Sequence, residues 1–256
     1  MTELQKRIIT GVVGTVVLFF IIIQGGLLLE AALFLISLEA IRELSNAFKA
    51  KDIHLNNIVL VIGAILLFLF QYFNISLEFS IIFVLLASII ILLFDEKYTL
   101  NDITYTVFSF IYAPYLFNLL YGLKQEFIFL VFVIAFSTDT FAYFVGMTFG
   151  KHKLIPKVSP KKSVEGAVGG IVCCLILTLV YFYFMNLPIN AISVIFIIIS
   201  SIAGQIGDLI ASKIKRVVGI KDYAKILPGH GGILDRFDST LMVIPFVYIL
   251  QFFLFN

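Results

Sequence analysis

The segment between residues 212 and 239 holds the densest set of side chains able to do chemistry. Its centre is the run Pro228-Gly-His-Gly-Gly232, whose three glycines allow a ligand to approach the backbone closely. Asp235 and Asp238 follow, and a helix would place both carboxylates on one face. Paired hard oxygen ligands beside cationic side chains suit Mg²⁺ with a bound polyphosphate. A tight glycine turn followed by solvated acids would explain any one of these features, but not the whole run.

Two further carboxylates, Asp139 and Asp208, lie within apolar stretches. A carboxylate near the bilayer centre costs about 2.5–3.5 kcal/mol on insertion scales, so each needs a partner, a cation or water. Helical spacing predicts a polar stripe that leads to the cytoplasm, formed by Gln205, Asp208, Ser212 and Lys215. The alternative for both acids is an internal hydrogen-bond network between helices. Glu30 and Glu39 fit that alternative better.

A basic segment covers residues 151–166 and carries the lysines Lys151, Lys153, Lys157, Lys161 and Lys162. Ser163 is the expected N-cap of the following helix, so free backbone amides and a positive helix end would lie beside the last two lysines. That combination binds phosphate. For a lysine-rich loop alone, contact with solvent or lipid headgroups is the alternative. Glu165 and three glycines spaced for close helix packing favour the binding site: Gly166, Gly169 and Gly170.

Membrane helices are the elements expected to position these residues. Of 256 residues, 61% are hydrophobic and 13% are charged, and the mean hydropathy is +1.09, well outside the balance of a soluble domain. We expect an all-α, polytopic protein with one integral membrane domain over residues 1–256, in which 1–125 is the less specific half and 126–256 the catalytic half. The net charge of +2 and the lack of an aromatic-interleaved basic patch argue against a nucleic-acid partner. The adjacent Cys173 and Cys174 predict no disulfide.

Crossing about 30 Å of hydrocarbon takes about 20 apolar residues. About nine transmembrane helices are predicted, at Ile8–Ile23, Leu27–Ile41, Ile58–Phe73, Phe79–Phe94, Ile103–Tyr121, Phe127–Met147, Val164–Met185, Ile189–Ala211 and Thr240–Phe255. The first two are short and joined only by residues 24–26, so a single helical hairpin or a partly re-entrant pair is the alternative there. Because apolar sequence resumes at Leu27, the first stretch is interpreted as a retained span and not as a signal peptide.

The distribution of lysine and arginine predicts the orientation. With the amino terminus in the cytoplasm, 17 of the 18 basic residues fall in inner segments, and only Lys124 lies in an outer loop. The longer connections, 150–163 and 212–239, also lie on the inner side. We therefore expect an odd number of spans, a cytoplasmic amino terminus and any chemistry at the cytoplasmic face.

The 212–239 segment resembles the signature of the phosphatidate cytidylyltransferases, the CDP-diacylglycerol synthases. The matching residues are Ser212, Lys215, Arg216, Lys221, Asp222, Pro228, His230, Gly231, Gly232, Asp235, Arg236 and Asp238. Further matches are Asp139–Gly146, Ser159–Lys162, Glu165–Gly166 and Gly207–Asp208. The resemblance thus covers most of the second half in the family's order and spacing. Ala224 stands where the family often has glycine.

This resemblance implies transfer of a cytidylyl group from CTP to phosphatidic acid, which yields CDP-diacylglycerol and pyrophosphate. It implies a divalent metal, Mg²⁺, with a monovalent cation as a further candidate cofactor. It also implies a helical membrane fold, usually dimeric, with a funnel-shaped site that faces the cytoplasm. Together with the phospholipid chemistry, it places the protein in the plasma membrane as a multi-pass homodimer.

The resemblance also implies roles for individual residues. The metal ligands would be Asp208, Asp235 and Asp238. The cations that neutralise phosphate charge would be Lys161, Lys162, Lys215, Arg216 and Arg236. Asp222 would orient one of these cations, and His230 would donate to a phosphate oxygen or protonate leaving pyrophosphate, unless it is a structural turn residue. The substrate-binding set would be completed by Asp139, Ser159, Glu165, Lys221, Gly231 and Gly232.

Three other functions are alternatives to this one. A transporter or channel would use Asp139 and Asp208 to line an ion path, but it predicts polar groups across the whole membrane depth. A CTP-using polyprenol kinase would share the polyphosphate site and attack the γ-phosphorus. A noncatalytic family member would not need every acidic and basic position of the signature. The sequence favours cytidylyl transfer.

Overall fold

Helices form almost all of the computed structural model, which describes residues 3–226 and 231–255, with side chains from residue 9. The elements in chain order are α1 (Glu3–Gln24), α2 (Gly26–Lys49), α3 (Asn57–Tyr72), α4 (Glu78–Phe94), α5 (Leu100–Phe110), a π-helical turn η1 (Ile111–Tyr115), α6 (Leu116–Leu119), a 3₁₀ turn η2 (Leu120–Gly122), α7 (Gln125–Phe149), β1 (Lys153–Ile155), β2 (Ser159–Ser163), α8 (Val164–Phe184), α9 (Ala191–Val218) and α10 (Leu234–Phe255). The predicted helical class is confirmed. The small antiparallel hairpin β1–β2 is an addition to it.

The chain divides into two compact units. The first contains Met1–Tyr121 and Val217–Arg236, and the second contains Gly122–Arg216 and Phe237–Asn256. The segment 217–236 thus belongs with the amino-terminal half, although the sequence signature continues through it. The expected single integral membrane domain stays a prediction.

Five helical segments among the described residues are long and apolar enough to cross a membrane. They are Leu100–Gly122, Gln125–Phe149, Val164–Phe184, Ala191–Val218 and Leu234–Phe255, which correspond to the last five predicted spans. Shorter apolar helices occur at Ile9–Gln24, Asn57–Tyr72 and Glu78–Phe94. By length and composition, the chain is a multi-pass membrane protein.

Several helices extend beyond the predicted spans, because an apolar run reflects the thickness of the hydrocarbon layer and not the full length of the helix. Two of these extensions, in α9 and α10, contain signature residues. α9 continues past Ala211 to Val218, and Lys215 and Arg216 occupy its last turn, where basic side chains interact favourably with the helix dipole. α10 begins at Leu234, six residues before the predicted Thr240. Its first turn therefore includes Asp235, and Asp238 follows three positions later. This confirms that the two acids lie on a helix, which is the condition under which their carboxylates share one face.

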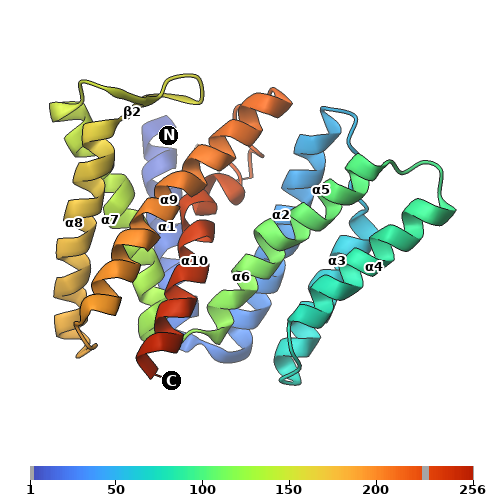
Figure 1. Cartoon of the computed structure of the whole chain (residues 1–256), viewed down its shortest axis with the longest axis horizontal. Helices are drawn as coiled ribbons and strands as arrows, with labels where there is room; N and C mark the ends of the chain where they lie inside the picture. Colours follow the sequence, from blue (N-terminus) through green and yellow to red (C-terminus); the bar gives the residue numbers. More distant parts are fainter. Residues whose placement is uncertain (1–2, 227–230, 256) are drawn as a thin grey trace. The chain divides into compact units, whose positions relative to one another are not determined.

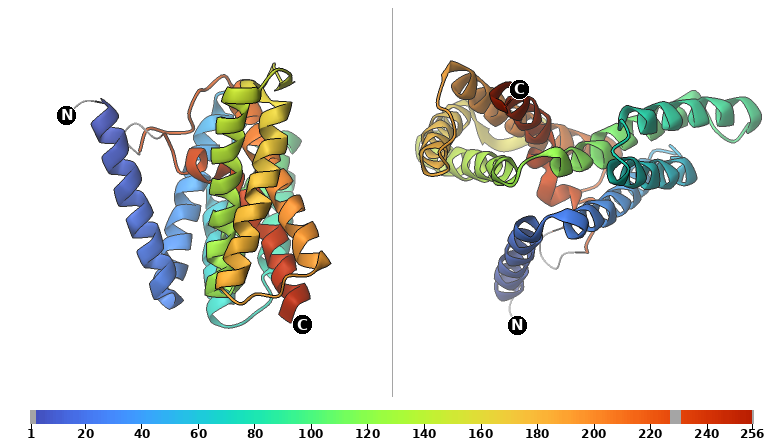
Figure 2. Two further views of the ribbon diagram at one scale, coloured as in Figure 1. Left: turned by 90° about the vertical axis from the view of Figure 1, so that its left-hand side faces the viewer. Right: turned by 90° about the horizontal axis from the view of Figure 1, so that it is seen from below.

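In the first unit, α1 and α2 are separate helices of 22 and 24 residues. The backbone between them reverses at Gly25 and Gly26, whose φ angles of 60° and 51° suit glycine. α3 and α4 run side by side (Figure 2). The predicted span Ile103–Tyr121 is α5 continued through the π-helical turn, which contains Pro114. Because proline lacks an N–H group and crowds the preceding turn, the helix widens there.

In the second unit, α7 and α8 lie side by side (Figure 1). An ideal Cβ at Gly166 would lie 2.6 Å from the carbonyl oxygen of Ala142, and one at Gly170 would lie 2.9 Å from that of Thr138. The two backbones can approach this closely only because glycine has no side chain. The prediction that these glycines serve close helix packing is confirmed.

Gly170→Ala should lower the stability of the protein by about 1–3 kcal/mol, because the new methyl group meets a backbone carbonyl that must shift. Gly14→Ala is the matched control, since, apart from its chain neighbours and its own helix backbone, no described atom lies within 4 Å of its ideal Cβ. There, alanine should be neutral or stabilising by up to about 1 kcal/mol, as expected for glycine replacement in a helix. Thermal unfolding in detergent measures both. Equal midpoints for the two variants would contradict the close contact of α7 and α8.

Candidate active site

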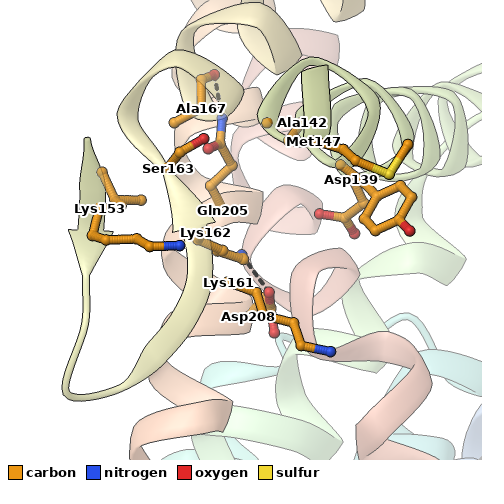
Figure 3. Close-up of a pocket in the computed structure, with 13 residues that line it drawn as sticks. Asp139, Ala142, Met147, Lys153, Lys161, Lys162, Ser163, Ala167, Gln205 and Asp208 are labelled. Carbon is orange, nitrogen blue, oxygen red and sulfur yellow. Dashed lines mark hydrogen bonds and ion pairs between the residues drawn. The ribbon is translucent and has the colours of Figure 1, made fainter. Parts of the chain in front are cut away.

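A cavity of about 440 Å³ lies in the second unit between α7, the β1–β2 hairpin, α8 and α9. Its lining includes the polar side chains of Asp139, Lys153, Lys161, Lys162, Ser163, Gln205 and Asp208 (Figure 3). Tyr143, Met147 and Leu154 give the same cavity an apolar wall. The cavity therefore combines several charges with apolar surface, which suits a ligand that has an ionic head and a hydrocarbon part.

The most direct polar contact in the cavity is an ion pair between Lys162 of β2 and Asp208 of α9 (Figure 3). Ser212, one turn along α9, donates a longer hydrogen bond of 3.4 Å to Oδ1 of Asp208. Gln205, one turn earlier, donates to the carbonyl oxygen of Ala167 at 3.1 Å. The predicted polar stripe on this helix therefore exists, and it is tied to the hairpin and to α8.

Two further acids of the second unit, Asp139 and Asp238, interact with charged or polar groups around Asp208. Asp139 of α7 accepts a hydrogen bond of 2.8 Å from the hydroxyl of Ser239 on α10. Asp238 is half-buried, and the charges of Asp208, Asp139 and Lys215 all act on it. The sequence indicates that Asp139 acts either as a site residue or as part of a hydrogen-bond network between helices. It does both, because it joins α7 to α10 by a hydrogen bond and also lines the cavity.

Gly207 explains how α10 comes close to Asp208 of α9. An ideal Cβ at Gly207 would lie 2.5 Å from the carbonyl oxygen of Asp238 and 2.9 Å from the side chain of Met242. Any larger residue at this position would push α10 away. The glycine that precedes Asp208 in the sequence therefore sets the approach of Asp238.

The chemistry of these acids fits a magnesium ion that is shared with phosphate. Among residues 9–226 and 231–255, no three His, Cys, Asp or Glu side chains are grouped so that they could hold a metal by themselves. Mg²⁺ does not need such a cage, since it commonly uses one or two carboxylates and completes its shell with water and substrate phosphates. Asp208 and Asp238 supply two hard oxygen donors whose negative charges act on each other. A divalent cation would offset that repulsion.

The hairpin that presents the lysines is fastened at its base. Ser163 accepts a hydrogen bond of 3.1 Å from the amide of Gly166, which confirms the predicted N-cap. Glu165 accepts hydrogen bonds from the backbone amides of Lys151 and His152 and contacts the His152 ring at 2.5 Å. Glu165 therefore orients the hairpin in this structure. Ser159 begins β2 opposite Ile155.

Apart from Arg216, the remaining signature residues with a described structure lie in the first unit. Oδ2 of Asp235 accepts hydrogen bonds from the amides of Tyr223 at 2.8 Å and Gly232 at 2.9 Å. Gly231 has a φ of 83°, a backbone conformation that favours glycine. Asp235 thus folds its own loop back onto the start of α10. The side chains of Lys221, Asp222 and Arg236 are exposed, as is that of Arg216 in the second unit.

His230, the predicted donor to a phosphate, lies outside the described residues. Two contributors were not predicted from the sequence. Ser239 binds Asp139, although a serine inside an apolar run carries no distinctive signal. Glu43 binds the amides of Ile233 and Leu234, and no local pattern connects residues so far apart in the chain.

Known proteins match this sequence along nearly the whole chain. Residues 5–254 match the cytidylyltransferase family. A phosphatidate cytidylyltransferase of Bacillus subtilis (strain 168) is 37% identical over 267 residues, which cover 98% of this chain and 98% of that protein. Proteins of the same name are 35% identical in Staphylococcus saprophyticus and 34% identical in Staphylococcus aureus (strain COL), each over 96% of this chain and 98% of theirs.

Proposed function

Because this chain belongs to the cytidylyltransferase family, we infer that it transfers a cytidylyl group from CTP to phosphatidic acid, forming CDP-diacylglycerol and pyrophosphate. Its relatives carry the name of that activity at 34–37% identity over nearly their full length. The structural observation that supports it best is the cavity in which Lys162 pairs with Asp208 beside Lys161 and Asp139. The protein is an enzyme of phospholipid biosynthesis.

The reaction needs positioning and charge neutralisation more than a strong base. A phosphate oxygen of phosphatidate forms a bond to the α-phosphorus of CTP while the bond from that phosphorus to the bridging oxygen breaks. Pyrophosphate leaves with the electron pair. The attacking oxygen is already anionic, so the main contributions of the chain are to align two anions and to stabilise charge in the transition state. We assign the second task to Lys161 and Lys162 of the cavity, with Lys215, Arg216 and Arg236 as further cations.

We propose that Asp208 and Asp238 hold a Mg²⁺ ion, which, when bound, supplies charge neutralisation to the phosphates. Asp235 stays in this proposal as a third ligand on its spacing alone, three residues before Asp238 on α10, while its Oδ2 accepts from the amides of Tyr223 and Gly232. A monovalent cation is a second proposed cofactor, assigned to no residue. Asp139, Ser159, Glu165, Lys221, Asp222, Gly231, Gly232 and His230 complete the proposed substrate-binding and catalytic set.

We further propose nine spans, a cytoplasmic amino terminus, a site that opens to the cytoplasm of a bacterial plasma membrane, and a homodimer. The strongest support for the orientation is the segregation of 17 of the 18 basic residues. The apolar wall formed by Tyr143 and Met147 supports entry of the lipid from the bilayer. CTP, which is soluble, would then arrive from the cytoplasm.

The test is an assay of detergent-purified protein with CTP, phosphatidic acid and Mg²⁺, in which pyrophosphate and CDP-lipid are measured together. Equal amounts of both products, and none when phosphatidic acid is omitted, are expected. CDP in place of pyrophosphate would indicate attack at the γ-phosphorus by a lipid kinase. If CTP is not consumed under any condition, cytidylyl transfer is wrong and the transporter alternative is reopened.

A further inference from the structure

Glu43 is a buried acid far from the signature in sequence, yet it binds residues 231–236 of the signature, called the signature loop below. It lies on α2, and its side chain is 0% exposed. Its Oε1 accepts a hydrogen bond of 2.7 Å from the amide of Ile233, and its Oε2 accepts one of 2.8 Å from the amide of Leu234. All of these residues belong to the first unit. The carboxylate thus supplies acceptors for two amides at the start of α10.

A carboxylate is the group that this position requires. The first amides of a helix have no acceptor within the helix, and a negative charge beside them is stabilising. Asp235, the acid inside α10, uses Oδ2 for the amides of Tyr223 and Gly232. Asp235 therefore binds the amide of Gly232, and Glu43 binds the next two amides, those of Ile233 and Leu234.

The close approach of Glu43 also requires a glycine at position 232. An ideal Cβ at this residue would collide with the carboxylate of Glu43, including a separation of only 2.6 Å from Cδ. Its φ lies outside the left-handed region, so backbone conformation does not by itself demand glycine. The reason for glycine is the close approach of Glu43.

We propose that Glu43 is a positioning residue for the signature loop: by fixing the backbone of residues 232–234 it sets the places of Asp235 and Arg236, which the proposed function assigns to metal and phosphate binding. The inference rests on that function. Glu43 acts through these residues, because its described contacts with the loop are to backbone amides. Asp235 and Arg236 lie in the first turn of α10, and Glu43 of α2 fixes the backbone at which that turn begins.

Glu43→Gln tests the proposal while the size of the side chain stays the same. The amide group can accept at its oxygen only, and its NH₂ faces a backbone donor, so the loop should shift. A displacement of about 1 Å can cost up to about 100-fold in rate. We expect kcat to fall by about 10- to 100-fold and the apparent Mg²⁺ activation constant to rise. Glu39→Gln is the matched control, since Glu39 lies one turn earlier on α2 and pairs with Arg42 at the surface.

Hydrogen exchange of the Mg²⁺-free protein provides a readout that does not depend on turnover. Peptides that contain residues 231–234 should exchange faster in Glu43→Gln than in the wild type or Glu39→Gln. A purely structural role predicts a lower thermal midpoint with an unchanged kcat and Mg²⁺ activation constant in the protein that remains folded. That result would overturn the proposal, as would unchanged exchange at 231–234.

A double-mutant cycle tests the contact with Gly232. Gly232→Ala alone should lower kcat, because the new methyl group displaces Glu43. In a Glu43→Ala background the space is open, so the same substitution should add little. Interaction energies of this kind identify residues in direct contact; additive losses would contradict the proposed coupling. A wild-type protein that forms no CDP-lipid would refute the proposed function instead, and the exchange experiment would still report on the contact.

Discussion

Asp208→Asn should lower kcat by roughly 10²- to 10³-fold, the loss usually seen when one charge-stabilising group is removed from an active site. Asp208 lines the cavity, pairs with Lys162 and lies near enough to Asp238 for their charges to interact. Asparagine keeps the shape and loses the anionic oxygen that Mg²⁺ prefers. The variant should therefore fold normally and need more Mg²⁺ for its residual activity.

The measurement is CDP-lipid formation over a Mg²⁺ titration, with thermal unfolding as a check on folding. Asp52→Asn is the matched control. Asp52 is exposed and has a φ of 56°, a conformation that asparagine tolerates well. It should keep wild-type kinetics. If Asp208→Asn retains more than about a tenth of wild-type kcat, Asp208 is not a metal ligand and serves only to pair with Lys162.

Lys162→Met should reduce kcat/KM for CTP by about 100-fold, because the transition state loses a cation from a cavity that collects phosphate charge. Lys157→Met is the control, since Lys157 is an exposed lysine of the same hairpin, in the turn between β1 and β2. If these lysines only contact solvent or lipid headgroups, the two variants should have the same kcat/KM for CTP. A large difference between them assigns Lys162 to the substrate.

The ion pair between Lys162 and Asp208 provides a second test of the site. Once Lys162 is replaced, Asp208 loses its ion-pair partner, so the effects of Lys162→Met and Asp208→Asn should not add. Steady-state kinetics of the double variant measures this coupling. Fully additive losses would mean that the ion pair has no part in organising the site.

Local features of this protein could be predicted from its sequence because the interacting residues are close along the chain. The Ser163 cap joins residues three positions apart, and the polar stripe of α9 follows from helical spacing alone. The glycines of α8 were recognisable because their spacing places them on one helix face. The family signature then supplied the chemistry that these patterns only suggest.

Features formed by distant residues could not be predicted in this way. The segment 151–163 contains lysines and prolines that are typical of a loop, and its hairpin depends on Glu165 binding the amides of Lys151 and His152. The boundary of α10 depends on amide acceptors from Glu43 and Asp235, which an apolar run does not reveal. The pairing of Asp139 with Ser239 joins residues 100 positions apart.

The contact of Glu43 also has a consequence for the order of biosynthesis. Its two partners lie 190 and 191 residues later in the chain, and at 5–20 residues per second a ribosome needs roughly 10–40 s to reach them. During that interval α2 exists with a carboxylate whose two amide partners have not yet been made. A nascent chain that stops before Ile233 therefore lacks both of the amides that Glu43 binds in the finished protein.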